Sequence, residues 1–199
     1  MEALFDIPLS VVPQPWAFVA FVLSSGVLAW ASAVDIKRRI VPGGAIAAGV
    51  LIWCAMLVFA AALGAVGWRS APTASVVREC GFLAGVGGAV LSAAFALLLD
   101  TALSRATGRA AIGMGDVKLL FVLGLHVGFL GALACLFVAC ALAALYSCAR
   151  FAFDAASRFV RPRRRHPGPA RPSFDGTFPF VPFLAAAYVA VAAASGLRW

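Results

Sequence analysis

The sequence predicts an all-α membrane protein in which residues 1–199 form a single domain with six transmembrane helices. Three observations predict it: an apolar composition, five long apolar runs, and basic residues gathered in alternate connections. Of the 199 residues, 63% are hydrophobic and 12% are charged, and the mean hydropathy is +0.99. These values lie outside the range of ordinary soluble domains. Because one span needs about 20 apolar residues, the length leaves no room for a sizeable soluble domain.

The apolar runs cover residues 15–34, 44–68, 81–99, 119–150 and 178–197. Four of them have the length of a single span. The run from Leu119 to Ala149 is too long for one untilted span and short for two. Charge decides its helix count. If the run is a hairpin, only Arg69, Arg78 and Arg198 of the 16 basic residues fall on one side, which leaves 13 on the other.

Basic residues concentrate on the cytoplasmic side of membrane proteins, so we expect the hairpin, six spans and both termini outside the cytoplasm. The first helix of the hairpin must then begin within residues 111–116, and the chain must turn near His126 to Gly131. Trp16 opens the first run with no basic residue before it. This start lacks the positive segment of a cleaved signal peptide, so the first span is expected to stay.

The net charge of +8 is interpreted here as a property of cytoplasmic loops beside anionic lipid, and not as a nucleic-acid surface. We expect a basic loop over residues 150–177, with its Arg- and Pro-rich part from Arg158 to Pro172. Such a loop should be solvated and lie near lipid headgroups.

Small and aromatic residues add packing expectations. The third span contains Gly81, Gly85, Gly87 and Gly88, a pattern that lets helix backbones approach closely in lipid. The five cysteines form no C-x-x-C pair, which argues against a zinc knuckle or a disulfide framework. We interpret them as buried small hydrophobes and expect no metal. Four tryptophans lie at or near span ends, and most of them are expected to be interfacial anchors: Trp16, Trp53, Trp68 and Trp199.

Two of the eight acidic residues stand out. Asp35 directly follows the first span and opens a compact link that ends at Pro42, a residue suited to starting the second helix. Asp116 ends the segment Gly113-Met114-Gly115-Asp116, whose glycines permit close backbone approach. Both aspartates fall at the same membrane face. The alternative is that each aspartate is an ordinary charged residue at the membrane interface near Lys and Arg.

Two carboxyl groups brought together in a low-dielectric site cannot both ionise easily, so they share a proton. Such a pair can hydrolyse a peptide bond, because the ionised carboxylate takes a proton from water while the protonated one donates to the carbonyl oxygen. The chemistry needs no metal or other cofactor.

Three segments carry a resemblance to a known family. The segment from Gly113 to Leu120, GMGDVKLL, resembles the G-x-G-D-x-K-L segment of type IV prepilin peptidases. Asp35-x-Lys37 leading to Val41-Pro42 resembles their D-x-[RK] leading to I-P-N. The segment FPFVPFL at residues 178–184 is similar to their P-F-x-P-F-L. The three segments follow in the family's order and point to its small members, associated with Tad/Flp pili.

The resemblance implies a G-x-G-D aspartic membrane protease that removes the basic leader of prepilins at the cytoplasmic face of the inner membrane. Asp35 and Asp116 match the family's catalytic aspartates. The supporting motif positions are Gly113, Gly115, Lys118, Lys37, Pro42, Pro179 and Pro182. Two departures occur: Gly43 stands where the family often has Asn, and Val41 replaces Ile. Larger members carry paired C-x-x-C motifs and also methylate the pilin, so this chain is expected to cleave without methylating.

Two other functions are compatible with these residues. Asp35 and Asp116 could relay protons in a transporter, or the chain could be a catalytically silent pilus-assembly scaffold. Transport sites are usually near the midplane of the membrane, whereas both aspartates are predicted at one face. Asp100, Asp154 and Asp175 are interpreted as solvated loop residues or helix caps. His126 is interpreted as a structural or interfacial histidine on the opposite face.

Overall fold

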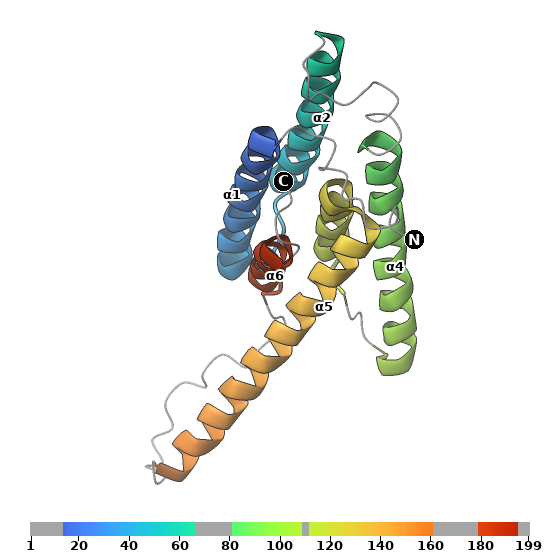
Figure 1. Ribbon diagram of the computed structural model, residues 1–199. Helices are drawn as coiled ribbons and strands as arrows, with labels where there is room; N and C mark the ends of the chain where they lie inside the picture. The colour runs from blue at the N-terminus through green and yellow to red at the C-terminus, as the bar shows by residue number, and fades with distance from the viewer. Residues whose placement is uncertain (1–13, 67–80, 109–111, 161–178, 195–199) are drawn as a thin grey trace.

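The computed structural model describes residues 14–66, 81–108, 112–160 and 179–194. These residues form the helices α1 (Gln14–Arg38), α2 (Gly43–Ala65), α4 (Ala84–Thr107), α5 (Met114–Val160) and α6 (Val181–Ala194), arranged as a bundle with one long oblique arm (Figure 1). No strand occurs among them. The predicted all-α class is confirmed.

One narrow face of helix α1 packs against the rest of the bundle. Ala20, Ser24, Leu28, Ala31 and Asp35 are buried and recur every three or four residues, which is the spacing of one helix face. Arg39 then adopts a left-handed conformation, with φ of 53°, and its N–H donates to the carbonyl oxygen of Asp35 at 2.8 Å. This is the usual hydrogen bond of a left-handed helix C-cap. Asp35 therefore lies in the last turn of α1, which corrects the expectation that it opens the link.

The centre of the bundle is built around the first part of α5. Leu119, Leu120 and Leu123 pack in one buried cluster with Leu28 of α1 and Val181 of α6. Each of these side chains is at most 4% exposed. The start of α5 is thereby fixed between α4 and α6, and α6 in turn packs against α1.

Helices α4 and α5 approach closely at small residues. A Cβ atom added at Gly88 would lie 2.7 Å from the carbonyl oxygen of Gly124, so only glycine fits there. Ser92 Oγ donates across the same contact to the carbonyl oxygen of Leu120 at 3.1 Å. The glycine pattern predicted this close approach, which is confirmed at Gly85 and Gly88, whereas an added Cβ at Gly87 would meet open space.

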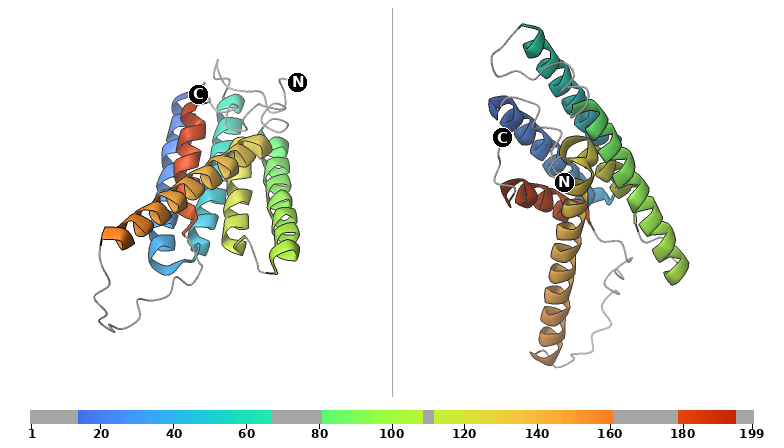
Figure 2. Two further views of the ribbon diagram at one scale, coloured as in Figure 1. Left: turned by 90° about the horizontal axis from the view of Figure 1, so that it is seen from below. Right: turned by 45° about the vertical axis from the view of Figure 1, so that its right-hand side comes forward.

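Helix α5 is two helices joined at Gly128, whose φ of 70° and ψ of 178° are not helical. This combination is essentially restricted to glycine. The first part rises from one end of the bundle and the second part descends obliquely across it (Figure 2, left). The start at Met114 and the turn at Gly128 both agree with the predicted hairpin. The helix continues to Val160, so the loop predicted from residue 150 begins later, because the apolar stretch Phe151–Phe153 extends the helix. Residues 161–178 lie outside the described residues.

Four helices are long and apolar enough to cross a membrane: Phe18–Arg38, Gly43–Ala65, Gly81–Thr107 and Met114–Phe153. The chain is therefore a multi-pass membrane protein. Helix α6 has 14 residues and a length of about 21 Å, less than the hydrocarbon core of about 30 Å. The count of six spans stays a prediction.

Two packing expectations are corrected. Cys135 is buried, but Cys54, Cys140 and Cys148 are exposed on the outside of their helices. Lipid is as apolar as a protein interior, so a small hydrophobic side chain is equally stable in either place. Trp53 is buried in the middle of α2 and covers Gly85 of α4, so it is a packing residue and not an interfacial anchor. The side chains of Cys80, Trp16, Trp68 and Trp199 lie outside the described part.

Candidate active site

Five helix ends meet at one end of the bundle. The last turns of α1 and α4 lie there, together with the first turns of α2, α5 and α6 (Figure 2, left). Asp35 belongs to the first of these ends and Asp116 to the start of α5. Residues separated by some 80 positions in the sequence are thus brought to the same end of the molecule.

Asp35 is held by α6. Its side chain is only 7% exposed, and its Oδ2 accepts a hydrogen bond from the backbone N–H of Val181 at 3.2 Å. The carboxyl group also interacts with the backbone of Phe180 and with the charge of Arg39. The buried carboxyl therefore has polar partners from α6 and from the link after α1.

The Val181 amide is available because the N–H groups in the first turn of a helix have no partner within the helix. Val181 is the first residue of α6, and Pro182 has no N–H to offer. The N–H groups of Phe183 and Leu184 both donate to the carbonyl oxygen of Phe180, at 3.0 and 3.2 Å. Among residues 181–184, the amide of Val181 is the one directed to Asp35. The positive end of the α6 dipole faces the carboxyl as well.

Asp116 is the third residue of α5 and is partly buried. The carbonyl oxygen of Gly113 accepts hydrogen bonds from the N–H groups of Asp116 and Val117, at 2.9 and 3.3 Å, so Gly113 caps the helix. The Asp116 carboxyl folds back over this cap and interacts with the Gly113 backbone, as an acidic residue does in a capping box. A Cβ atom added at Gly113 would lie 3.3 Å from Asp116 Oδ2, so the glycine leaves room for the carboxyl.

Gly115 brings the link between α1 and α2 against this first turn. A Cβ atom added at Gly115 would lie 2.6 Å from Cγ2 of Val41, a distance that real Cβ atoms do not show. The absence of a side chain is therefore required for Val41 to pack here. The second motif glycine joins the segment after Asp35 to the helix that carries Asp116.

The charge of Asp35 acts on the carboxyl of Asp116, and Gly115 holds the link after Asp35 against the turn that contains Asp116. Among the described residues, no group of three or more His, Cys, Asp or Glu side chains is placed to hold a metal ion. Two carboxyl side chains are thus brought to this end of the bundle.

Comparison with known families gives a match between residues 21–148 and the type IV leader peptidase family. The match covers well over half of the chain. The chain belongs to the type IV leader peptidase family. The prepilin peptidase resemblance read from the sequence is thereby confirmed. As a member of a leader peptidase family, the chain is classed as a protease.

The family match includes Asp35 and the segment Gly113–Asp116 and ends before Pro179. The link from α6 to Asp35 is therefore an observation from the structure of this leader peptidase that is independent of the match. No curated protein and no solved structure matches the chain.

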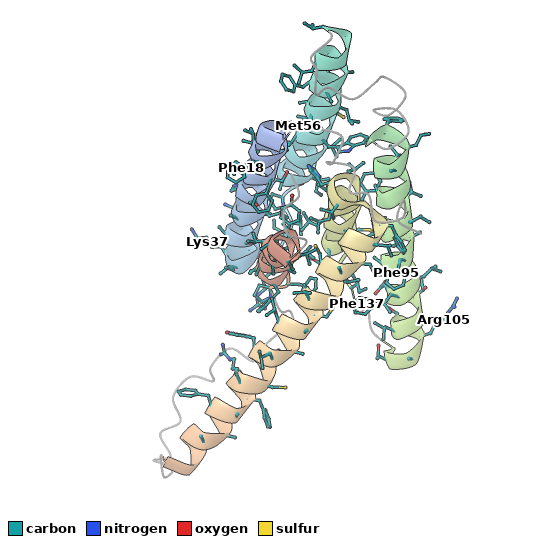
Figure 3. The ribbon with its side chains drawn as sticks, viewed as in Figure 1. Phe18, Lys37, Met56, Phe95, Arg105 and Phe137 are labelled. Carbon is teal, nitrogen blue, oxygen red and sulfur yellow. The ribbon has the colours of Figure 1, made fainter. Side chains whose placement is uncertain are left out.

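The supporting residues divide into two groups. Gly113, Gly115 and Pro182 shape the surroundings of the aspartates as described above, and Pro179 lies two residues before the first residue of α6. Pro42 has an extended conformation and forms the N-cap position of α2. Lys37 and Lys118 are exposed, and Lys37 projects away from the bundle (Figure 3). The structure brings neither lysine side chain into the interior with the carboxyls.

Sequence reasoning missed two groups at this end of the leader peptidase. The Val181 amide was hidden because a backbone donor has no sequence signature of its own, although Pro182 marks a helix start. Asp100 was interpreted as a solvated loop residue or a helix cap, which is wrong: it lies inside α4 and accepts the N–H of Ile112 at 2.8 Å. His126 is buried, and its Nδ1 donates to the carbonyl oxygen of Val122 at 2.9 Å.

Proposed function

We propose that this leader peptidase is an aspartic endopeptidase that removes the basic leader of Tad/Flp-type prepilins at the cytoplasmic face of the inner membrane. Asp35 and Asp116 are its catalytic residues. The observation that carries the proposal is the placement of both aspartates at one end of the bundle: Asp35 is buried and held by the Val181 amide, and Gly115 packs the link after Asp35 against the turn that contains Asp116. No cofactor takes part.

The reaction uses one ionised and one protonated carboxyl. The ionised carboxylate removes a proton from a water molecule as the water oxygen attacks the carbonyl carbon, and the protonated carboxyl gives its proton to the carbonyl oxygen. The tetrahedral intermediate then collapses: the C–N bond breaks, the nitrogen takes a proton from the first carboxyl, and the hydroxyl returns its proton to the second. The pair ends with the one proton it began with.

The position of the pair suits a substrate with a basic leader followed by an apolar helix. Such a chain places its charged part in water and its helix in lipid, so the bond between them lies at the membrane boundary. Asp35 lies in the last turn of α1 and Asp116 in the first turn of α5. Both carboxyls are therefore expected at the membrane boundary, at the depth of the bond to be cleaved.

The cytoplasmic orientation rests on the charges around the pair. The described basic residues near these helix ends are Lys37, Arg38, Arg39, Arg105 and Lys118, and Figure 3 labels Lys37 and Arg105. No Lys or Arg occurs in the first turns of α1 and α4 or in the last turns of α2 and α6, which lie at the opposite end. The positive-inside tendency therefore favours the cytoplasm for the end that carries Asp35 and Asp116.

The test is cleavage of a prepilin by the purified protein and its Asp35→Asn and Asp116→Asn variants. Each variant should lose all measurable cleavage, because an amide keeps the size of the side chain but cannot cycle a proton. Asp154→Asn, in the last two turns of α5, is the matched control and should cleave like wild type. Wild-type activity should fall at both acidic and alkaline pH, since the pair needs one proton.

Retained cleavage in Asp116→Asn, at wild-type levels of protein in the membrane, would overturn the aspartic mechanism. Absence of cleavage by the wild type would instead favour a silent scaffold or a transporter.

The same enzyme should leave the new pilin N-terminus unmethylated. The proposal rests on the five cysteines, none of which forms the C-x-x-C pairs of the bifunctional members that the sequence resembles. Mass analysis of pilin cleaved in the presence of S-adenosylmethionine should give the mass of the free amine. An added mass of one methyl group would contradict the expectation.

A further inference from the structure

Asp100 connects the end of α4 to the start of α5. Its Oδ1 accepts hydrogen bonds from the backbone N–H of Ile112 at 2.8 Å and from Ser104 Oγ at 3.3 Å. The side chain is half-buried and sits two turns before the end of α4, inside a helix that is otherwise rich in apolar residues. An acidic residue in such a place is costly unless it is hydrogen-bonded.

The hydrogen bond reaches the segment that carries Asp116. Ile112 directly precedes Gly113, and Gly113 caps the turn that contains Asp116. Helix α4 itself ends at Gly108, whose φ is 70° and whose N–H donates to the carbonyl oxygen of Ser104 at 2.8 Å. Asp100 therefore ties the residue before the cap back to a helix that has already ended.

The Ile112 side chain gives this tie a second point of attachment, because it packs against the main buried cluster. With its amide held by Asp100 and its side chain held by the core, Ile112 has a defined position and direction. The next residues, Gly113 to Asp116, leave from that fixed point. A glycine in this run would otherwise allow several backbone paths.

We propose that Asp100 is a positioning residue of this enzyme, which fixes the start of α5 and so sets the place of the Asp116 carboxyl relative to Asp35. The proposal rests on the proposed function. Asp100 does not touch the reacting atoms. It supplies a hydrogen-bond acceptor to the Ile112 N–H. A side chain of the same length that carries an acceptor should therefore replace Asp100, whereas a side chain without an acceptor should not.

The test compares Asp100→Ala with Asp100→Asn. Displacing a catalytic group by about 1 Å can lower a rate by about 100-fold, so Asp100→Ala should lower kcat by about 10- to 100-fold with a smaller change in KM. Asp100→Asn keeps an oxygen at the same distance and should restore most of the activity. Thr101→Val is the matched control, because the exposed Thr101 hydroxyl donates only within its own helix, to Leu98 at 2.8 Å.

A second readout is independent of cleavage. Amide hydrogen exchange over residues 112–116 should become faster in Asp100→Ala and stay near the wild-type rate in Asp100→Asn, while exchange near Ser92 stays unchanged in both. If Asp100→Ala does not accumulate, Asp100→Gln takes its place, because its amide group is displaced by one methylene and should fail to restore kcat.

Wild-type cleavage together with unchanged kcat and unchanged exchange in Asp100→Ala would overturn the positioning role and leave the proposed function intact. Equal loss of activity in Asp100→Asn and Asp100→Ala would overturn it too, since the charge and not the acceptor would then matter. No cleavage by the wild type would count against the proposed function itself, and the exchange experiment would still decide whether Asp100 fixes the start of α5.

Discussion

Gly115 allows the side chain of Val41 to lie against the first turn of α5. Gly115→Ala places a methyl group where Cγ2 of Val41 would be 2.6 Å away, and overpacking of this kind costs about 1 to 3 kcal/mol. We expect a loss of cleavage of tenfold or more, because the turn that carries Asp116 must move. Measuring cleavage at matched protein levels checks the expectation.

The decisive comparison is a double variant. Val41→Ala removes Cγ2, the closest atom, and leaves Cβ at 2.9 Å, so Gly115→Ala with Val41→Ala should regain part of the activity that Gly115→Ala loses. Gly26→Ala is the control, since an added Cβ there meets nothing within 4 Å. Failure of Val41→Ala to restore any activity would mean that Gly115 matters for its own backbone and not for this contact.

For single residues, the sequence indicated which residue types matter, but it could not predict which residues they contact. The spacing of Gly113 and Gly115 before Asp116 predicted close backbone approach, and the structure has it. That Val41 is the partner could not be predicted, because it depends on where the link after α1 passes α5. Asp100 illustrates the same limit, since Ile112 is 12 residues away in the sequence and only the fold brings its amide to Asp100.

Helix α6 acts on the site through the end of its backbone. The N–H of Val181 donates to Asp35 Oδ2, and a hydrogen bond to a charged group contributes about 1.5 to 3 kcal/mol. Val181→Pro removes this donor at the first position of a helix, where proline is well tolerated. We expect cleavage to fall by about tenfold or more, since each 1.4 kcal/mol corresponds to a factor of ten.

Val181→Ala provides the control for this change. It removes most of the buried side chain but keeps the N–H, so any activity lost beyond the level of Val181→Ala reports on the hydrogen bond. The measurement is kcat/KM for prepilin cleavage by the two variants. Equal values for Val181→Pro and Val181→Ala would contradict a role for the amide.

The elements could be predicted where composition or charge determines them. Apolar runs located the helices, and the distribution of basic residues predicted a turn near His126 to Gly131, where Gly128 breaks α5. The length of α5 after the break was underestimated, because a lipid-facing helix can continue past Arg150 without losing favourable contacts. Trp53 was misassigned because its burial depends on Gly85 of a neighbouring helix.

The path of the whole chain relates the hairpin to the site. Helix α5 begins at the end of the bundle that carries Asp35, and the chain is back at that end at Val181, whose N–H donates to Asp35. A single crossing between Asp116 and Val181 would leave α6 starting at the opposite end. The out-and-back course of α5 around Gly128 provides the return, and it agrees with the larger share of basic residues on the side of Asp35.

This course predicts the side of the membrane on which residues 161–178 lie. In a variant whose five native cysteines are replaced by alanine, Ser173→Cys should react with a membrane-impermeant thiol reagent only after the cytoplasmic face is opened. Ala71→Cys, in the connection after α2, should react in intact spheroplasts and serves as the opposite control. If α5 crossed the membrane once, Ser173→Cys would label from outside together with Ala71→Cys. That result would reject the six-span topology, because the return of the chain to Asp35 would then have to occur without a second crossing.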